Sequence, residues 1–179
     1  TDSGPASVPD PEPTRAPRTV IAYLCGDNNL SAEVDIKIMA LRQGMERIGP
    51  TDANLIVYAD YRDAMPELIR ITHEGRTTLK RYAEINSASP DNFRNVLDEI
   101  IDMYPAESYG LICFSHASGW LPQGALNDPE GYNRARSAGT RSIFEDSGRE
   151  MSLADFAGAL PLPNGRKFDF IVLETCFMA

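Results

Sequence analysis

The sequence predicts an α/β protein built on a mostly parallel sheet. Short runs of bulky, β-branched and aromatic residues, bounded by Gly, Pro and Asn, have the composition of strands buried on both faces. Between these runs lie stretches whose apolar residues recur with the 3.6-residue period of a helix. The alternation of the two patterns along the chain is typical of the α/β class.

Four segments are predicted as strands of this sheet. Each is apolar nearly throughout, and each ends in a polar or turn-forming group. The segment from Lys167 onward, which contains Phe168, Phe170 and Leu173, is interpreted as the central strand, buried on both faces. The four segments are residues 19–24, 54–59, 109–114 and 167–176.

The connections between strands are predicted to be helical, with one exception. Residues 67–84 alternate apolar and charged side chains about a Glu-Gly-Arg turn, which favours an antiparallel hairpin beside the sheet. Helices are expected over residues 31–48 and 90–104 and in a short stretch after residue 152. The predicted N-caps are Ser31, Ser89 and Ser152.

The first 18 residues form a segment of their own. Residues 1–18 hold prolines at positions 5, 9, 11, 13 and 17 among Ser, Asp and Glu, which predicts an extended tether rather than folded structure. The chain starts at Thr1 without Met, which either a removed secretion or lipoprotein signal or an expression boundary explains. We therefore expect a secreted or envelope-associated protein, with a lipoprotein anchor as one form of attachment.

Residues 19–179 are expected to form a single folded unit that is part of a larger one. Ala179 follows the predicted central strand by three residues, where an α/β domain normally continues into a helix. We expect the remainder of the polypeptide, as a continuation or a separate chain, to complete the domain. Residues 117–150 show no period and are rich in Gly, Asn and Arg, which predicts a flexible, functional loop open to proteolytic cutting.

Composition excludes several classes of function. A net charge of −9 argues against a nucleic-acid partner and weakly favours cationic ligands. No apolar run approaches the roughly 18 residues that a transmembrane span needs. The three cysteines offer neither a disulfide framework nor a metal-binding spacing, so no metal ligand is assigned, and Cys25 and Cys113 are interpreted as packing residues.

Reactive side chains follow two of the predicted strands. His116 comes directly after residues 109–114 and Ser115, and Glu174 and Cys176 end the last strand. Ligand sites of α/β sheets lie at the carboxyl ends of strands, so parallel neighbours would bring this imidazole and thiol together. The pair has the composition of a cysteine nucleophile with its histidine base. His73, the other histidine, lies within the predicted hairpin and suits a solvated position.

Three motifs in this order resemble those of clostripain-type cysteine peptidases. They are Tyr-Leu-Cys-Gly-Asp-Asn-Asn-Leu (23–30), Ser-His-Ala-Ser-Gly-Trp (115–120) and Glu-Thr-Cys-Phe-Met (174–178), and the resemblance extends from Thr19 to the end. It implies a caspase-like sheet, shared with gingipains and legumain. It further implies a Cys–His dyad, cleavage after Arg or Lys, and activation by a cut between the segments that carry His and Cys.

The resemblance also implies roles for single residues. His116 and Cys176 match the dyad, and Glu174 falls where members usually carry Asp, near the floor of the pocket for a cationic side chain. Ala117 stands where caspase relatives have Gly, so its backbone N–H is a candidate oxyanion donor together with that of Cys176. Trp120 either walls the substrate cleft or packs against the sheet.

Two further features are carried by the resemblance alone. Calcium is required by some members, although the sequence requires no cofactor and has no calcium-loop spacing. The region that family members process holds a basic, small-residue segment with three candidate cleavage sites, Arg134, Arg136 and Arg141.

The leading hypothesis is therefore an endopeptidase that cleaves after Arg or Lys through a thioester acyl-enzyme. A catalytically silent relative that binds basic peptides in the same cleft is the first alternative. Glu174 itself has a second interpretation, as the partner of a structural Arg rather than as part of the substrate pocket. The second alternative is a flavodoxin-like binder of nucleotides or phosphate. It needs a Gly-rich loop after the first strand, and residues 25–30 hold one glycine and an acid there, which counts against it.

Overall fold

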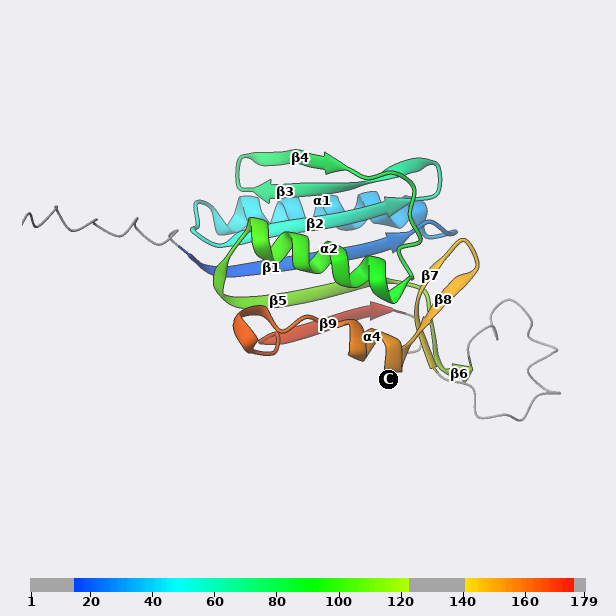
Figure 1. Cartoon of the computed structure of the whole chain (residues 1–179). Helices are drawn as coiled ribbons and strands as arrows, with labels where there is room; N and C mark the ends of the chain where they lie inside the picture. Colours follow the sequence, from blue (N-terminus) through cyan, green and yellow to red (C-terminus); the bar gives the residue numbers. More distant parts are fainter. Residues whose placement is uncertain (1–14, 123–140, 176–179) are drawn as a thin grey trace, which may run out of the picture.

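The computed structural model describes residues 15–122 and 141–175, with residues 119–122 and 141 described by their backbone alone. The described chain forms one sheet of six strands in the order β4-β3-β2-β1-β5-β9 and a second of three strands in the order β6-β7-β8 (Figure 1). The strands are β1 (Ala16–Gly26), β2 (Asn54–Tyr61), β3 (Ala64–Thr72), β4 (Gly75–Arg81), β5 (Ala106–Ser115), β6 (Ala117–Pro122), β7 (Arg141–Asp146), β8 (Arg149–Ser152) and β9 (Phe170–Thr175).

The pairing within the large sheet confirms the predicted α/β class. β1 pairs in parallel with β2 and β5, and β5 pairs in parallel with β9. β3 and β4 form an antiparallel hairpin that extends the sheet beyond β2, as the alternating pattern of residues 67–84 predicted. The parallel strands end together, and the second, antiparallel sheet lies at their carboxyl ends (Figure 1).

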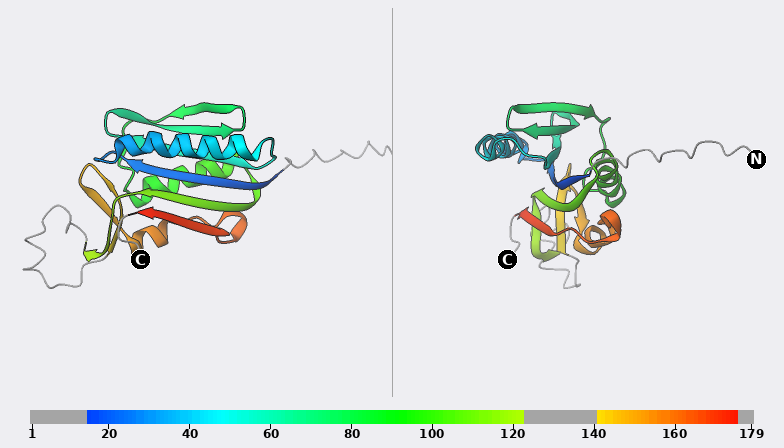
Figure 2. Two further views of the ribbon diagram at one scale, coloured as in Figure 1. Left: turned by 180° about the vertical axis from the view of Figure 1, so that it is seen from behind. Right: turned by 90° about the vertical axis from the view of Figure 1, so that its left-hand side faces the viewer.

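Helices cover both faces of the large sheet. α1 (Ser31–Ile48) lies on one face, and α2 (Pro90–Met103) with the short α4 (Leu153–Ala159) lies on the other (Figure 2). Each face has its own apolar cluster, because alternate residues of a strand point to opposite sides. A single-turn 3-10 helix, Pro163–Gly165, precedes β9.

An aromatic cluster forms the centre of the α2 face. Tyr23 of β1 stacks on Tyr58 of β2 with ring centroids 4.6 Å apart, and it contacts Phe93 of α2 and Phe144 of β7. Both tyrosine hydroxyls bind Ser87, one through its carbonyl oxygen and the other through its hydroxyl. Because Phe144 comes from the second sheet, that sheet shares the hydrophobic core of the first.

The last strand does not occupy the place that the sequence predicted. β9 lies at the edge of the described sheet with only β5 beside it, whereas β1 is central. Ile171 and Val172 are 39% and 43% exposed, so the expectation of a central strand buried on both faces is wrong within the described residues. An apolar run reports a tendency toward burial, and it carries no information on strand order.

The expectation of irregular chain over residues 117–150 is wrong at both ends of that range. Residues from Ala117 onward form β6, and residues 141–152 form the hairpin of β7 and β8. Phe144 and Ser147 have positive φ and the register shifts beside Phe144, so the alternation that would have revealed β7 is broken. Residues 123–140 lie outside the described part of the chain.

The predicted helix starts have mixed outcomes. Ser152 caps α4, and its hydroxyl accepts a hydrogen bond from the backbone N–H of Asp155 at 3.0 Å. Ser89 occupies the N-cap position of α2 without a side-chain bond to the helix. Ser31 is the first helical residue of α1 rather than its cap, and its hydroxyl accepts from the N–H of Arg62 instead.

We predict that Gly110→Ala destabilises the protein by about 1–3 kcal/mol, as overpacking does. Gly110 of β5 is paired with Phe170 of β9, and a Cβ on it would lie 2.1 Å from Cζ of that ring. Urea unfolding measures the loss. The matched control is Gly44→Ala in α1, where a Cβ meets nothing within 4 Å, and it should be neutral or stabilising by up to about 1 kcal/mol.

A double-mutant cycle checks the physical reason. In a Phe170→Ala background the ring is gone, so Gly110→Ala should cost much less than it does in the wild type. An equal cost in both backgrounds would show that the ring is not what the glycine accommodates.

Candidate active site

The carboxyl ends of β5 and β9 form one edge, as the sequence predicted. The parallel register runs from Gly110 opposite Phe170 to Ser115 opposite Thr175. His116 directly follows Ser115 in the chain, and Cys176 directly follows Thr175. Cys176 itself lies outside the described residues, so its meeting with His116 stays a prediction. The register places Ser115 and Thr175, the residues that precede His116 and Cys176, side by side on neighbouring strands.

His116 is held by the loop that follows β1. This half-buried side chain forms a hydrogen bond between its Nε2 and Oδ1 of Asn29. An amide oxygen only accepts hydrogen bonds, so the contact assigns a proton to Nε2 and leaves Nδ1 for another partner. Asn29 lies within the 23–30 motif, but no local pattern pointed to a role for its side chain.

The loop that carries Asn29 is fixed by its neighbour Asn28. The Asn28 side chain is buried, and its Nδ2 donates to the carbonyl oxygens of Glu145 at 2.7 Å and Cys25 at 3.4 Å. Its Oδ1 accepts from the N–H of Leu30 at 2.8 Å. Three bonds from one side chain therefore join the end of β1, the start of α1 and the β7–β8 hairpin.

The second sheet is attached to the same edge by serine hydroxyls. Ser115 exchanges hydrogen bonds with the backbone of Glu145 in β7 at 3.1 and 3.4 Å. The hydroxyls of Ser118 in β6 and Ser142 in β7 bond to each other at 2.8 Å. Serine in a Gly-rich stretch is a weak signal of a structural role, so these three serines were not predicted from the sequence.

Glu174 lies on the α1 face of β9 with a cation beside it. Its Oε2 forms an ion pair with Nζ of Lys37 in α1 at 2.9 Å, and both side chains are partly exposed. The same Nζ lies 5.2 Å from the ring centroid of Phe114, the residue paired with Glu174 across the sheet. Helical spacing alone could not have named Lys37 as the partner of Glu174, and the role of Glu174 in a substrate pocket stays a prediction.

The other predicted residues are described in part or not at all. Ala117 is buried at the start of β6, where it is paired with Ile143. Trp120 lies in β6 and Arg141 at the start of β7, but their side chains lie outside the description. Arg134 and Arg136 fall in the range that is not described.

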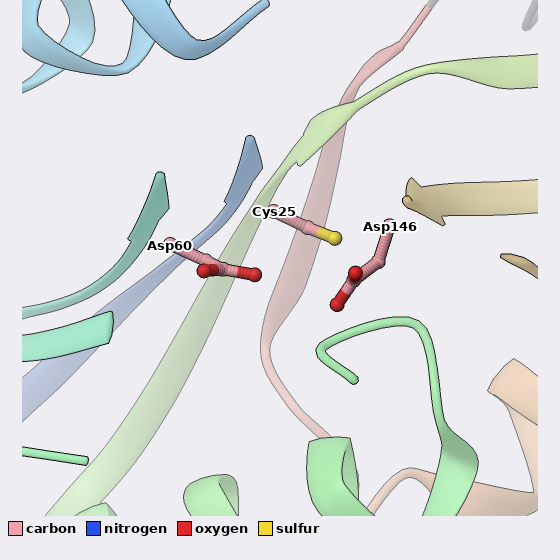
Figure 3. Close-up of side chains that lie close together, drawn as sticks. All are labelled: Cys25, Asp60 and Asp146. Carbon is pink, nitrogen blue, oxygen red and sulfur yellow. The ribbon is translucent and has the colours of Figure 1, made fainter. Parts of the chain in front are cut away.

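A second polar cluster lies on the opposite face of the sheet. Sγ of Cys25, at the end of β1, and carboxylate oxygens of Asp60 and Asp146 lie within 4.8 Å of one another, and all three residues are buried (Figure 3). Burial, together with the neighbouring carboxylates, raises the pKa of Asp60 to about 7 and of Asp146 to about 6, and it raises the pKa of the Cys25 thiol well above its usual value. Both carboxylate oxygens of Asp60 are buried, and neither has a partner within hydrogen-bonding distance among the described residues.

The comparison with family models matches the Clostripain family over residues 22–179. The chain belongs to the clostripain family. This confirms the resemblance drawn from the three motifs, and it argues against the flavodoxin-like alternative. A search of curated proteins found no match.

Solved structures similar to this chain include other proteins of the clostripain type. An inactive zymogen C11 protease from Parabacteroides distasonis is 35% identical, with a TM-score of 0.72, over 93% of this chain and 44% of that one. A secreted C11 cysteine protease from Bacteroides thetaiotaomicron, solved with an irreversible peptide inhibitor, is 31% identical, with a TM-score of 0.70, over 90% of this chain and 43% of that one. A B. fragilis cysteine protease is 34% identical, with a TM-score of 0.54, over 59% of this chain and 92% of that one.

The chain spans less than half the length of the first two of these structures. The similarity therefore covers the part of the clostripain-family fold that carries the three motifs. The activity, substrates and partners of a whole protein do not follow from it directly.

We predict that Asn28→Asp destabilises this edge of the clostripain-family fold by about 1–3 kcal/mol or more. The substitution keeps the shape of the side chain, but it removes both Nδ2 donors and places a charge beside two carbonyl oxygens. Urea unfolding measures the change. The control is Asn92→Asp, which loses a single bond, to the carbonyl of Asn86, in the first turn of α2, where a carboxylate is favoured. Equal losses for the two variants would contradict a special role for Asn28.

Proposed function

We propose that this protein is a cysteine endopeptidase that cleaves on the carboxyl side of Arg, or of Lys, through a His116–Cys176 dyad. The observation that carries the proposal is the parallel β5–β9 register, which ends with the residues before His116 and Cys176 opposite each other. Membership of the clostripain family supports the reaction class. Two similar structures are described as C11 proteases, one of them bound to an irreversible peptide inhibitor.

In the proposed reaction the Cys176 thiolate attacks the carbonyl carbon of the scissile peptide bond. The C–N bond breaks, His116 protonates the leaving amine, and a thioester remains until water hydrolyses it. Because Asn29 holds Nε2, Nδ1 is the atom of His116 from which that proton would be delivered. Backbone N–H groups of Ala117 and Cys176 would stabilise the oxyanion, each by about 3 kcal/mol as in other acyl-transfer enzymes.

Substrate preference is proposed to depend on Glu174. A guanidinium donates two parallel hydrogen bonds to a carboxylate, whereas an ammonium acts as a point charge, so both cations bind and the first binds better. Lys37 already pairs with this carboxylate, so a substrate cation must share it or displace Lys37. Trp120, which follows His116 by four residues, is proposed to line the same cleft.

Activation by proteolytic cleavage and secretion from the cell are also part of the proposal. A cut after Arg134, Arg136 or Arg141 would separate the His116 segment from the Cys176 segment, and one similar structure is described as an inactive zymogen. Another is described as secreted, which supports secretion of this protein. The predicted tether of residues 1–18 is too long at its end, because β1 already begins at Ala16, so the residues before Ala16 are proposed as the tether to a lipoprotein anchor. No helix in the described part of the chain is long and apolar enough to cross a membrane.

We predict that a peptidyl-Arg electrophile labels Cys176 and neither of the other thiols. Cys25 and Cys113 are buried, and burial raises the pKa of both thiols, so they supply little thiolate. Mass spectrometry of the treated protein locates the label and also reveals any cut after Arg134, Arg136 or Arg141. Cys176→Ala should abolish both the labelling and the hydrolysis of an Arg fluorogenic peptide, whereas Cys113→Ala should keep both.

Two results would count against the peptidase. Hydrolysis that survives Cys176→Ala would show that another group, or a contaminant, does the chemistry. Tight binding of Arg peptides with no turnover and no labelling, in both intact and processed protein, would support the alternative of a catalytically silent relative.

We predict that Glu174→Gln lowers kcat/KM for an Arg peptide by about 10- to 100-fold, the equivalent of one charged hydrogen bond. Lys37→Met provides the matched comparison, because it removes the other half of the ion pair. If Glu174 binds substrate, Lys37→Met frees the carboxylate and leaves kcat/KM unchanged or raised. If Glu174 is only a structural partner of Lys37, both variants should lower stability and activity alike, without changing the ratio of Arg to Lys cleavage.

A further inference from the structure

The cluster of Cys25, Asp60 and Asp146 has the composition of a metal site. A thiolate and two carboxylates are ligands that a divalent transition ion accepts. In the described ranges, 15–122 and 141–175, it is the one group of three such residues with ligand atoms this close together. The side chains come from the ends of β1, β2 and β7 and point toward one another (Figure 3). It lies on the α2 face, away from Glu174 and Lys37.

Asp60 supplies an independent reason to expect a ligand. It is 0% exposed, and neither carboxylate oxygen has a partner within hydrogen-bonding distance in the described chain. Burial raises the pKa of Asp60 and outweighs the nearby Ser87 hydroxyl, which is bonded to Tyr58 and acts to lower that pKa. A buried carboxylate without a partner is costly, so such groups are normally paired, protonated or bound to a metal. Its two neighbours do have bonds: Asp146 accepts from the N–H of Ser87, and the Cys25 thiol donates to the carbonyl of Glu145 at 3.5 Å.

The surroundings of the cluster are acidic. The charged groups that act most strongly on Asp60 are Asp146, Glu84 and Asp27, all carboxylic acids. Burial among groups of one sign destabilises the folded state unless a cation compensates them. A divalent ion would balance two of the three charges of one thiolate and two carboxylates.

We propose that Cys25, Asp60 and Asp146 bind a divalent transition-metal ion of the Zn²⁺ class. Typical bonds to zinc are about 2.3 Å for sulfur and about 2.1 Å for carboxylate oxygen, so ligand atoms around one ion lie roughly 3.6 Å apart. The present separations, within 4.8 Å, need side-chain shifts on the order of 1 Å to reach that value. On binding, the thiol releases its proton to solvent, and a fourth coordination position remains for water.

Calcium does not fit this site. Ca²⁺ takes six to eight oxygen ligands, and a thiolate is a poor ligand for it. The calcium that the family resemblance implies for some members would therefore have to bind elsewhere. The proposed ion would have a structural role. It would join the ends of β1 and β2 to the β7–β8 hairpin, beside the loop whose Asn29 holds His116.

The test uses the intact protein with Cys176→Ala, so that metal binding to the dyad does not contribute and the outcome is separate from peptidase activity. After dialysis against a chelator, the protein is titrated with Zn²⁺, Co²⁺ and Ca²⁺. We expect one Zn²⁺ per chain by elemental analysis, a rise in Tm with Zn²⁺ but not Ca²⁺, and a thiolate-to-metal charge-transfer band with Co²⁺.

Matched variants distinguish this cluster from other metal-binding positions. Asp60→Asn and Cys25→Ser keep the shape of each ligand and should weaken Zn²⁺ binding by at least about 100-fold, and the second should also abolish the Co²⁺ charge-transfer band. Cys113→Ser, which changes a buried thiol outside the cluster, should leave both readouts unchanged. Circular dichroism of each variant without metal checks that the variant is folded.

The proposal is overturned if the folded wild-type site takes up no Zn²⁺ or Co²⁺. In that case the Cys25 thiol and the carboxyl groups of Asp60 and Asp146 bind protons and no metal ion. It is equally overturned if Asp60→Asn and Cys25→Ser bind the ion as tightly as the unmodified cluster does, since the ion would then lie elsewhere.

Discussion

Parallel pairing of β5 with β9 is the constraint on which the functional edge depends. The two strands are far apart in the sequence, and the register of their backbone hydrogen bonds fixes which residues leave the sheet together. Because side chains alternate along a strand, a shift of one residue would send Glu174 to the α2 face, away from Lys37. Gly110 helps to set this register, since only a glycine there leaves room for the Phe170 ring.

The second sheet stabilises the carboxyl ends of the parallel strands, where the candidate active site lies. Phe144 joins the aromatic cluster of the large sheet, and the serine hydroxyls of residues 115, 118 and 142 bind β6 and β7 to the end of β5. Asn28 adds the loop after β1 to the same assembly. His116 and its partner Asn29 therefore lie among elements that are joined by bonds from three separate parts of the chain.

The candidate site was predicted only where the sequence is locally informative. His116 and Glu174 stand directly at strand ends, so their edge of the sheet followed from the strands alone. Asn29 and Lys37, which contact them, lie on a loop and a helix face where many residues are polar, and nothing local distinguished these two. The cluster at residues 25, 60 and 146 has no motif spacing, because each ligand comes from a different element.

The sequence by itself determined the α/β class, the strands of the large sheet, the helices, the β3–β4 hairpin and the family. These follow from side-chain periodicity, turn residues and short motifs, which are properties of neighbouring residues. Only the tertiary structure decided that β1 rather than β9 is central, that residues 141–152 form a hairpin, and that Asp60 is buried beside Cys25. Strand order and burial depend on which distant segments pack together, and the free energy of that packing is a sum over the whole fold that no local pattern contains.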